Sequence, residues 1–128
     1  MKWKTSMPDK KNNKITGQKG EAIACEYLKK SGYKILATNF RYSRLSEIDI
    51  VAKEKDTIVF VEVKTRSTTA FGHPFEAINK QKLSHIFQAG LYYLKTSGEK
   101  FKNYRIDIIS VLEPDNPKIE HLKNISLN

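Results

Sequence analysis

The sequence lacks the features of membrane and secreted proteins. Its single cysteine, Cys25, cannot form a disulfide within the chain, which is typical of a reducing compartment. Its apolar runs are short, such as the four residues Ile58–Val61, whereas a membrane-spanning helix needs about 20. The basic N-terminus has no apolar segment of the kind found in secretory signals. These absences predict a soluble, cytoplasmic protein with no membrane partner.

Motifs of several enzyme classes are also missing. The three histidines, His73, His85 and His121, have no spacing that pairs them as zinc ligands. No glycine-rich phosphate loop occurs, which argues against an ATPase or a dinucleotide-dependent enzyme. Cys25 has no general base beside it and lies on an apolar helical stripe, which indicates a core residue rather than a nucleophile.

Negative charge is scarce relative to positive charge. The chain has 23 Lys and Arg against 14 Asp and Glu, a net charge of +9. A basic domain of this size commonly attracts polyanions, because each neutralised phosphate releases counterions. Residues 1–14 are polar without periodicity, and we interpret them as a flexible basic arm. Residues 15–128 form one domain that is still basic, which favours nucleic acid as a partner over a role in solubility alone.

Hydrophobic periodicity predicts two helices and five strands. The helices are expected over residues 16–31 and 77–96, and the strands over residues 33–40, 47–52, 57–64, 104–112 and, at an edge, 119–125. Gly32 is placed to end the first helix. Residues 66–76 form a longer loop, in which Gly72 and Pro74 interrupt regular secondary structure. Apart from the edge strand, the order is α-β-β-β-α-β, which predicts an α/β fold in which helices flank a mixed sheet.

The most informative segment is a pair of strands joined by a polar turn. Because side chains alternate faces along a strand, Glu47 and Asp49 share one face of the first strand, and Glu62 and Lys64 share one face of the second. A turn centred on residues 55–56 places Asp49 opposite Glu62 and Glu47 opposite Lys64. The other face then collects six apolar residues: Ile48, Ile50, Ala52, Val59, Val61 and Val63.

Two opposed carboxylates in a half-buried sheet indicate a metal site. Directly opposed Cβ atoms lie about 4.5–5.5 Å apart, so Asp49 and Glu62 would repel each other unless one took up a proton. A divalent cation removes the conflict, and Mg²⁺ prefers such oxygens while keeping several waters. Lys64 could orient or deprotonate a water, or stabilise charge on a phosphoryl oxygen. Glu21, on the buried stripe of the first helix, could add an outer ligand.

The same residues have a simpler interpretation. Glu47 and Lys64 could form an exposed cross-strand salt bridge, with Asp49 and Glu62 solvated at a sheet edge. Against this, both strands are too apolar for an edge, and a further acid lies on the stripe of the first helix. On the residues alone, a metal site and a solvated salt-bridge cluster both stay open.

Other polar residues near the strand ends are candidates for contact with phosphate. They are Arg41, Arg44, Thr65, Arg66, Ser67, Lys80 and Lys82. Each also has an ordinary interpretation as solvated charge or as a strand-end hydrogen bond. Tyr92 and Tyr93 could stack on unpaired bases, although packing is the commoner role of aromatic residues at a helix end.

Several motifs, spaced along most of the chain, match a known pattern. They are Gly20-Glu21, Gly32-Tyr33, Asn39-Phe40-Arg41, Glu47-Ile48-Asp49, the run from Phe60 to Arg66, and Phe71-Gly72. Over roughly residues 17–112 the chain resembles the YraN family of bacterial predicted endonucleases, which is similar to archaeal Holliday-junction resolvases and the PD-(D/E)xK fold. The resemblance implies a restriction-endonuclease-like αβββαβ core. Ser46 departs from the family pattern, which usually has Gly there, so the loop 42–46 would approach DNA differently.

The resemblance also implies roles for individual residues. Asp49, Glu62, Glu21 and the backbone carbonyl of Val63 would be metal ligands, and Lys64 would be the catalytic lysine. Mg²⁺ or Mn²⁺ would be the cofactor, and a homodimer would act on DNA, including branched DNA. The leading hypothesis is a Mg²⁺-dependent DNA endonuclease. The alternatives are a non-catalytic nucleic-acid-binding module and a protein-interaction domain.

Overall fold

The secondary-structure elements follow the predicted order. The structure, a computed structural model, describes residues 10–67 and 78–126, with side chains from residue 17 onward. Its elements are α1 (Lys10–Lys30), β1 (Lys34–Arg41), β2 (Glu47–Glu54), β3 (Thr57–Arg66), α2 (Lys80–Thr96), β4 (Asn103–Leu112) and β5 (Lys118–Leu122). Neither of the two helices in these ranges has the length and apolar character needed to cross a bilayer.

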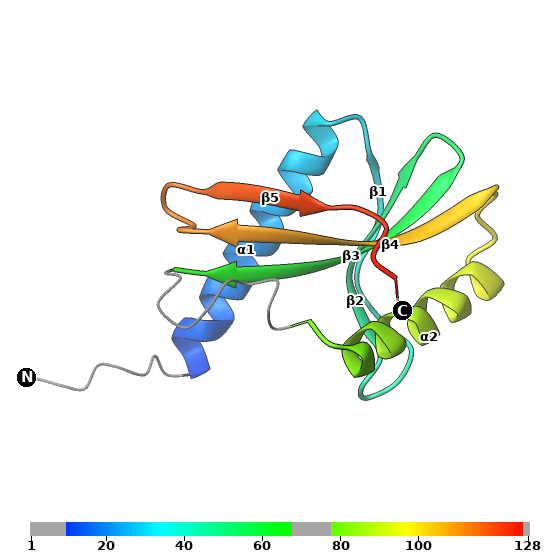
Figure 1. Ribbon diagram of the computed structural model, residues 1–128, viewed down its shortest axis with the longest axis horizontal. Helices are drawn as coiled ribbons and strands as arrows, with labels where there is room; N and C mark the ends of the chain where they lie inside the picture. Colours follow the sequence, from blue (N-terminus) through cyan, green and yellow to red (C-terminus); the bar gives the residue numbers. More distant parts are fainter. Residues whose placement is uncertain (1–9, 68–77, 127–128) are drawn as a thin grey trace, which may run out of the picture.

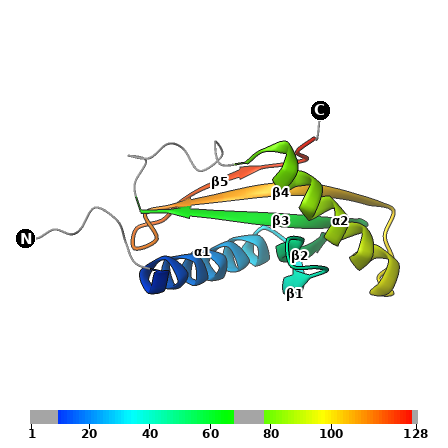
Figure 2. The ribbon, with the colours of Figure 1, turned by 90° about the horizontal axis from the view of Figure 1, so that it is seen from below.

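The five strands form one mixed sheet in the order β1-β2-β3-β4-β5. Strands β3 and β4 are parallel, and every other neighbouring pair is antiparallel. Helix α2 lies in the connection between the two parallel strands, which cannot be joined by a tight turn. Helices α1 and α2 lie on opposite faces of the sheet (Figures 1 and 2). The fold is therefore the predicted αβββαβ core, extended by the edge strand β5.

Strand β3 lies between two hydrophobic cores because its side chains alternate. Val61 joins Ala24 and Leu28 of α1 in one core, whereas Phe60 joins Ile86 of α2 in the other. All five side chains are at most 1% exposed. Burying a side chain the size of valine or phenylalanine contributes roughly 1.5–3 kcal/mol. The apolar pattern of β3, buried on both faces, thus fixes both helices around it.

Helix α1 ends where the sequence predicts but begins earlier. Gly32 has φ +92°, its N–H donates to the Lys29 carbonyl (3.1 Å), and the Tyr33 N–H donates to the Leu28 carbonyl (2.9 Å). This arrangement is a Schellman cap. The helix starts at Lys10 rather than at residue 16, because periodicity detects only apolar residues and misses a polar extension built on good helix formers such as lysine.

Some of the predicted features lie outside the described residues. Residues 1–9, which are most of the expected basic arm, belong to this group. So do Gly72 and Pro74 of the predicted loop, together with His73.

The β2–β3 hairpin has the predicted register over its paired part. Val51 lies opposite Phe60 and Ile50 opposite Val61, and the turn is formed by Lys55 and Asp56. One part of the face assignment was wrong, since Ile48 packs in the α2 core rather than with the other five apolar residues of the pair. The part of β2 that precedes Ile50 is paired only with β1. There Ile48 lies opposite Phe40, which packs against the α2 core.

Candidate functional site

The site lies where β2 and β3 separate. The ladder between these strands ends at Ile50 and Val61, so Ile48 and Val63 do not pair although their positions continue the register. Instead, the Val63 N–H donates to Oδ2 of Asp49 at 2.8 Å. The Asp49 carboxylate therefore replaces a backbone acceptor, and the gap between the strands opens beside it.

Asp49 and Glu62 face each other and share a side-chain hydrogen bond. Glu62 is 3% exposed, so its carboxylate has almost no water around it. Burial, and then the charges of Glu62 and Glu21, raise the pKa of Asp49 to about 8, against a partial lowering by the Val63 N–H. A hydrogen bond between two carboxyl groups requires one proton, and the raised pKa of Asp49 favours a pair that shares one.

Two lysines lie against the same oxygen of Glu62. The Nζ atoms of Lys64 and Lys82 are each 3.4 Å from Glu62 Oε2. Lys64 belongs to β3 and Lys82 to the first turn of α2, which is fixed by a hydrogen bond from the Lys82 N–H to Oδ1 of the N-cap residue Asn79 (2.8 Å). The sequence indicated Lys82 only as a phosphate contact. The structure places it directly beside the acids.

Glu21 approaches the acids from α1. The side chain of Asn39 lies close enough to act on the Glu21 carboxylate, whose charge in turn acts on both Glu62 and Asp49. Burial raises the pKa of Glu21, the Asn39 side chain lowers it in part, and the charges of Glu47 and Glu62 raise it further. Asn39 was not predicted as a site residue. Its φ of 52° is in the left-handed region, which Asn tolerates better than most residues.

A close contact between helix and strand positions Glu21. A Cβ atom at Gly20 would lie 1.9 Å from Oγ1 of Thr65, so only glycine allows α1 to lie this close to β3. Thr65, predicted as a phosphate contact, is therefore half-buried under α1. Its main effect in the described structure is to set the distance between Glu21 and the sheet.

The oxygen atoms of the site fit a hard cation. Within the described ranges, no group of three His, Cys, Asp or Glu residues is arranged to hold a metal by itself. Mg²⁺, however, is usually held by one or two carboxylates and keeps several waters. The Val63 carbonyl can add a further ligand oxygen. The Val63 N–H points to Asp49 on β2, and the N–H and C=O of a strand residue point to the same neighbouring strand. Asp49, Glu62 and this carbonyl suit such an ion, with Glu21 in an outer position.

The predicted pairing of Glu47 with Lys64 does not form. Glu47 Oε2 instead lies 3.1 Å from a guanidinium nitrogen of Arg41 on β1, because the strands separate before Glu47 reaches β3. The other guanidinium nitrogen of Arg41 donates to the Arg44 carbonyl at 3.1 Å. Arg41 therefore orders the loop after β1, while the side chain of Arg44 is exposed.

The remaining predicted phosphate contacts lie at the two ends of the undescribed segment 68–77. Ser67 and Lys80 are exposed, and Arg66 is partly buried at the end of β3, where its carbonyl accepts the Glu113 N–H at 2.8 Å. Lys80 is two residues from Lys82 on α2. Among the described residues, no hydrogen bond or ion pair links Arg66, Ser67 or Lys80 to Asp49.

Ser46 has an internal role. It is 1% exposed, its hydroxyl donates to Oε1 of Gln88 on α2 at 3.3 Å, and its carbonyl accepts the Tyr42 N–H at 2.9 Å. The residue that departs from the family pattern therefore ties the β1–β2 loop to α2 rather than facing outward.

A second buried carboxylate was not identified from the sequence. Asp107 on β4 is fully buried and accepts hydrogen bonds from Arg105 (2.9 Å) and from the Asn124 N–H (2.9 Å), while His121 Nε2 lies 2.7 Å away. Burial alone would raise the pKa of Asp107, but the bonds from His121, Arg105 and Asn124 outweigh it and hold this pKa below its ordinary value. Both oxygens of Asp107 have hydrogen-bond partners, so we assign this network a structural role.

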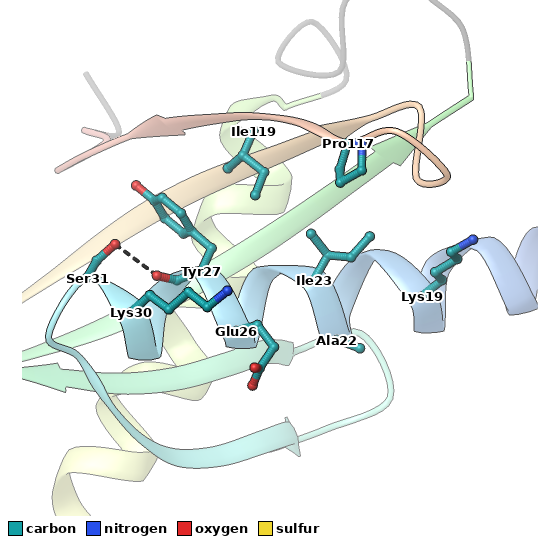
Figure 3. A pocket seen from close by; sticks show the side chains of 9 residues that line it. All are labelled: Lys19, Ala22, Ile23, Glu26, Tyr27, Lys30, Ser31, Pro117 and Ile119. Atoms are coloured by element: carbon teal, nitrogen blue, oxygen red, sulfur yellow. Dashed lines mark hydrogen bonds between the residues drawn. The ribbon is translucent and has the colours of Figure 1, made fainter.

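The network borders an apolar groove between α1 and β5. Tyr27 Oη lies 2.9 Å from His121 Nδ1, and its ring lines the groove together with Ile23, Pro117 and Ile119 (Figure 3). The groove has a volume of about 510 Å³, and none of the acids or lysines of the candidate site lines it.

Comparison with known proteins identifies the family. The profile of the "Uncharacterised protein family UPF0102" matches residues 20–111, a range that contains the acids and both lysines of the site. A UPF0102 protein of Alkaliphilus oremlandii is 50% identical over 115 residues, which cover 88% of this chain and 97% of that protein. One of Syntrophomonas wolfei is 43% identical over 113 residues (88% and 97%), and one of Acetivibrio thermocellus is 44% identical over 120 residues (93% and 92%). The chain therefore belongs to family UPF0102, the YraN family.

Proposed function

We propose that this protein is a metal-dependent endonuclease that hydrolyses phosphodiester bonds of DNA. The observation that supports this most strongly is the hydrogen-bonded pair of Asp49 and Glu62 at the gap between β2 and β3, with Lys64 against Glu62. Burial and then the charge of Glu62 raise the pKa of Asp49 to about 8, and a divalent cation would relieve both effects.

The residues of the site have separate tasks in this proposal. A Mg²⁺ or Mn²⁺ ion held by Asp49, Glu62 and the Val63 carbonyl would supply an activated water and stabilise charge on the phosphoryl oxygens. Lys64, fixed by its ion pair with Glu62, is placed to orient the attacking water or to contact a phosphoryl oxygen. Glu21, beside Asn39 and with a raised pKa, is suited to accept a proton from water in an outer position.

The charge distribution supports a polyanionic substrate. The net charge of +9 contrasts with the acidic site, and Arg44, Ser67 and Lys80 are exposed. Contacts from such residues position a DNA backbone without reading its sequence. The proposal includes a homodimer that acts on branched DNA, because two copies related by a twofold axis would present two sites to the strands of a symmetric junction. It also includes a cytoplasmic location.

A cleavage assay tests the proposal. The protein is incubated with a four-way junction, a flap, a linear duplex and single-stranded DNA in Mg²⁺, Mn²⁺ or EDTA. We expect metal-dependent cleavage, reduced by about 100-fold or more in Glu62→Gln and in Lys64→Ala. Glu26→Gln and Lys102→Ala are matched controls, since these side chains are 64% and 80% exposed. Circular dichroism checks that each variant is folded.

One observation favours a second candidate function. Glu62 is already compensated by two ammonium groups, as in a domain that keeps the nuclease fold without using a metal. Salt-sensitive DNA binding with no cleavage in either metal would support this non-catalytic module and refute the endonuclease. A protein that neither binds nor cleaves any of the four DNAs would refute both.

A further inference from the structure

Helix α2 presents a stripe of hydrogen-bond donors and aromatic groups that begins at the candidate site. The helix contains no Asp or Glu. Lys82, His85, Gln88, Tyr92 and Lys95 follow one another at intervals of three or four residues, so they share one face of the helix. The first residue of the stripe, Lys82, forms an ion pair with Glu62 of the candidate site, and the stripe becomes more exposed toward Lys95.

The stripe leads to a surface groove with two exposed tyrosines. Tyr42 is 49% exposed and Tyr92 is 42% exposed, and their ring centroids are 4.8 Å apart. Phe40 supports Tyr92 from inside, with ring centroids 6.1 Å apart. The groove has a volume of about 480 Å³ and is lined by these two tyrosines with Gln88, Leu91 and Lys95. The outer ring surfaces are therefore available to a flat ligand.

The groove is close to the acids along the chain. Ser46 bonds to Gln88 of the groove and precedes Asp49 by three residues, a distance of about 10 Å along a strand. Successive nucleotides in one strand of a duplex rise about 3.4 Å. A base in the groove would thus lie within about three nucleotides of a phosphate at Asp49.

We propose that the groove lined by Tyr42 and Tyr92 binds an unpaired base of the DNA strand whose phosphate lies at the acidic site. This inference rests on the proposed action on DNA and adds the substrate class, namely DNA with unpaired nucleotides beside the cleaved bond. The base stacks on a tyrosine ring, Gln88 meets its edge, and Lys95 contacts the next phosphate. A paired base cannot do this because its faces are covered by its neighbours in the duplex.

The charge around the groove favours nucleic acid over a protein partner. Lys95 lines it, and Arg44 lies in the adjoining loop, both exposed. The nearby acid Glu47 is paired with Arg41. Exposed Leu45 and Leu91 add apolar surface, which a protein interface would also use, so the test includes that outcome.

The experiment measures binding separately from cleavage. Fluorescence anisotropy in EDTA compares a forked duplex, single-stranded oligothymidine and a blunt duplex for the wild type, Tyr92→Ala, Tyr42→Ala and Tyr92→Phe. We expect each alanine variant to weaken binding to the fork and the single strand by about 10-fold, and to the blunt duplex by less than about two-fold. Tyr92→Phe should bind like the wild type, because stacking needs the ring and not the hydroxyl. Phe101→Ala, at a residue 38% exposed outside the groove, is the matched control.

A fluorescent 2-aminopurine base in the unpaired arm of the fork reports stacking directly. We expect the wild type and Tyr92→Phe to quench it and both alanine variants not to do so. Equal weakening on the fork and on the blunt duplex would overturn the inference. So would unchanged DNA binding with a loss of self-association in sedimentation, which would assign the groove to a protein interface.

The outcomes also separate this inference from the endonuclease proposal. Binding to forks that depends on Tyr92 without any cleavage would refute the endonuclease and leave the groove standing. Cleavage by a protein whose fork binding ignores both tyrosines would refute the groove and leave the endonuclease standing. The absence of binding to every DNA would refute both.

Discussion

Replacing Asp49 by asparagine tests whether burial and the charge of Glu62 make ionisation of Asp49 unfavourable. In the wild type the Val63 N–H donates to Asp49 Oδ2, and the carboxyl group shares a hydrogen bond with Glu62. In Asp49→Asn the amide oxygen can still accept from Val63, and the amide nitrogen donates to Glu62. The variant therefore resembles the protonated wild type at every pH, without the conflict that appears when Asp49 ionises.

The size of the effect follows from the raised pKa. Folding raises the pKa of Asp49 from 3.8 to about 8, so the folded protein binds this proton more tightly than the unfolded chain. The resulting stabilisation is fully present below pH 3.8 and is lost as the pH rises to about 8. Each pKa unit corresponds to about 1.4 kcal/mol, which gives a ceiling on the order of 6 kcal/mol. Asp49→Asn should escape this loss.

Urea unfolding of the metal-free protein in EDTA, from pH 5 to pH 8, measures the difference. We expect the free energy of unfolding of Asp49→Asn to gain on the wild type by about 1 kcal/mol per pH unit, with unchanged m-values. Asp56→Asn, at a turn acid that is 66% exposed, should show no such trend. A difference between Asp49→Asn and the wild type that is the same at pH 5 and pH 8 would refute the reasoning.

Three further predictions concern packing, the second carboxylate and metal binding. Gly20→Ala should destabilise the fold by about 1–3 kcal/mol in urea unfolding because its Cβ meets Thr65, whereas Gly17→Ala, with nothing within 4 Å, should stabilise it by about 0.5–1 kcal/mol. Asp107→Asn should cost about 3–5 kcal/mol at pH 7, and the contribution of Asp107 should vanish as the pH falls below 3.8 through its lowered pKa. Calorimetry of Mg²⁺ binding at pH 7, in two buffers of different ionisation enthalpy, should show release of about one proton by the wild type and none by Asp49→Asn.

The sequence predicted the fold and the hairpin because both depend on local patterns. Alternation of apolar residues in β2 and β3 excluded every second register, and a turn centred on residues 55–56 selected one of the rest, which the pairing of Val51 with Phe60 confirms. Gly32 ended α1 as expected, since a left-handed C-cap needs glycine at that position. In each case the information lies within a few residues of the feature it determines.

The parts that were missed depend on contacts between distant elements. Lys82 reaches Glu62 only because α2 packs on β3, and its spacing along α2 does not reveal this. Glu47 pairs with Arg41 because β2 and β3 separate at the point where the Val63 N–H bonds to the Asp49 side chain. The sequence placed Asp49 and Glu62 on neighbouring strands, but it could not say where the ladder between these strands stops.

The limit of local patterns is clearest at two aspartates, the partly buried Asp49 and the fully buried Asp107. Ile48-Asp49-Ile50 and Ile106-Asp107-Ile108 are identical tripeptides in strands of the same sheet. Asp107 is surrounded by donors and its pKa is lowered, so its burial strengthens the fold as long as it is ionised. Asp49 faces Glu62, its pKa is raised, and its ionisation weakens the fold. A fold gains nothing from the second arrangement, because Asn or Thr at this position would avoid the cost. The partners of each carboxyl group, and not its burial or its sequence context, therefore separate the structural acid from the functional candidate.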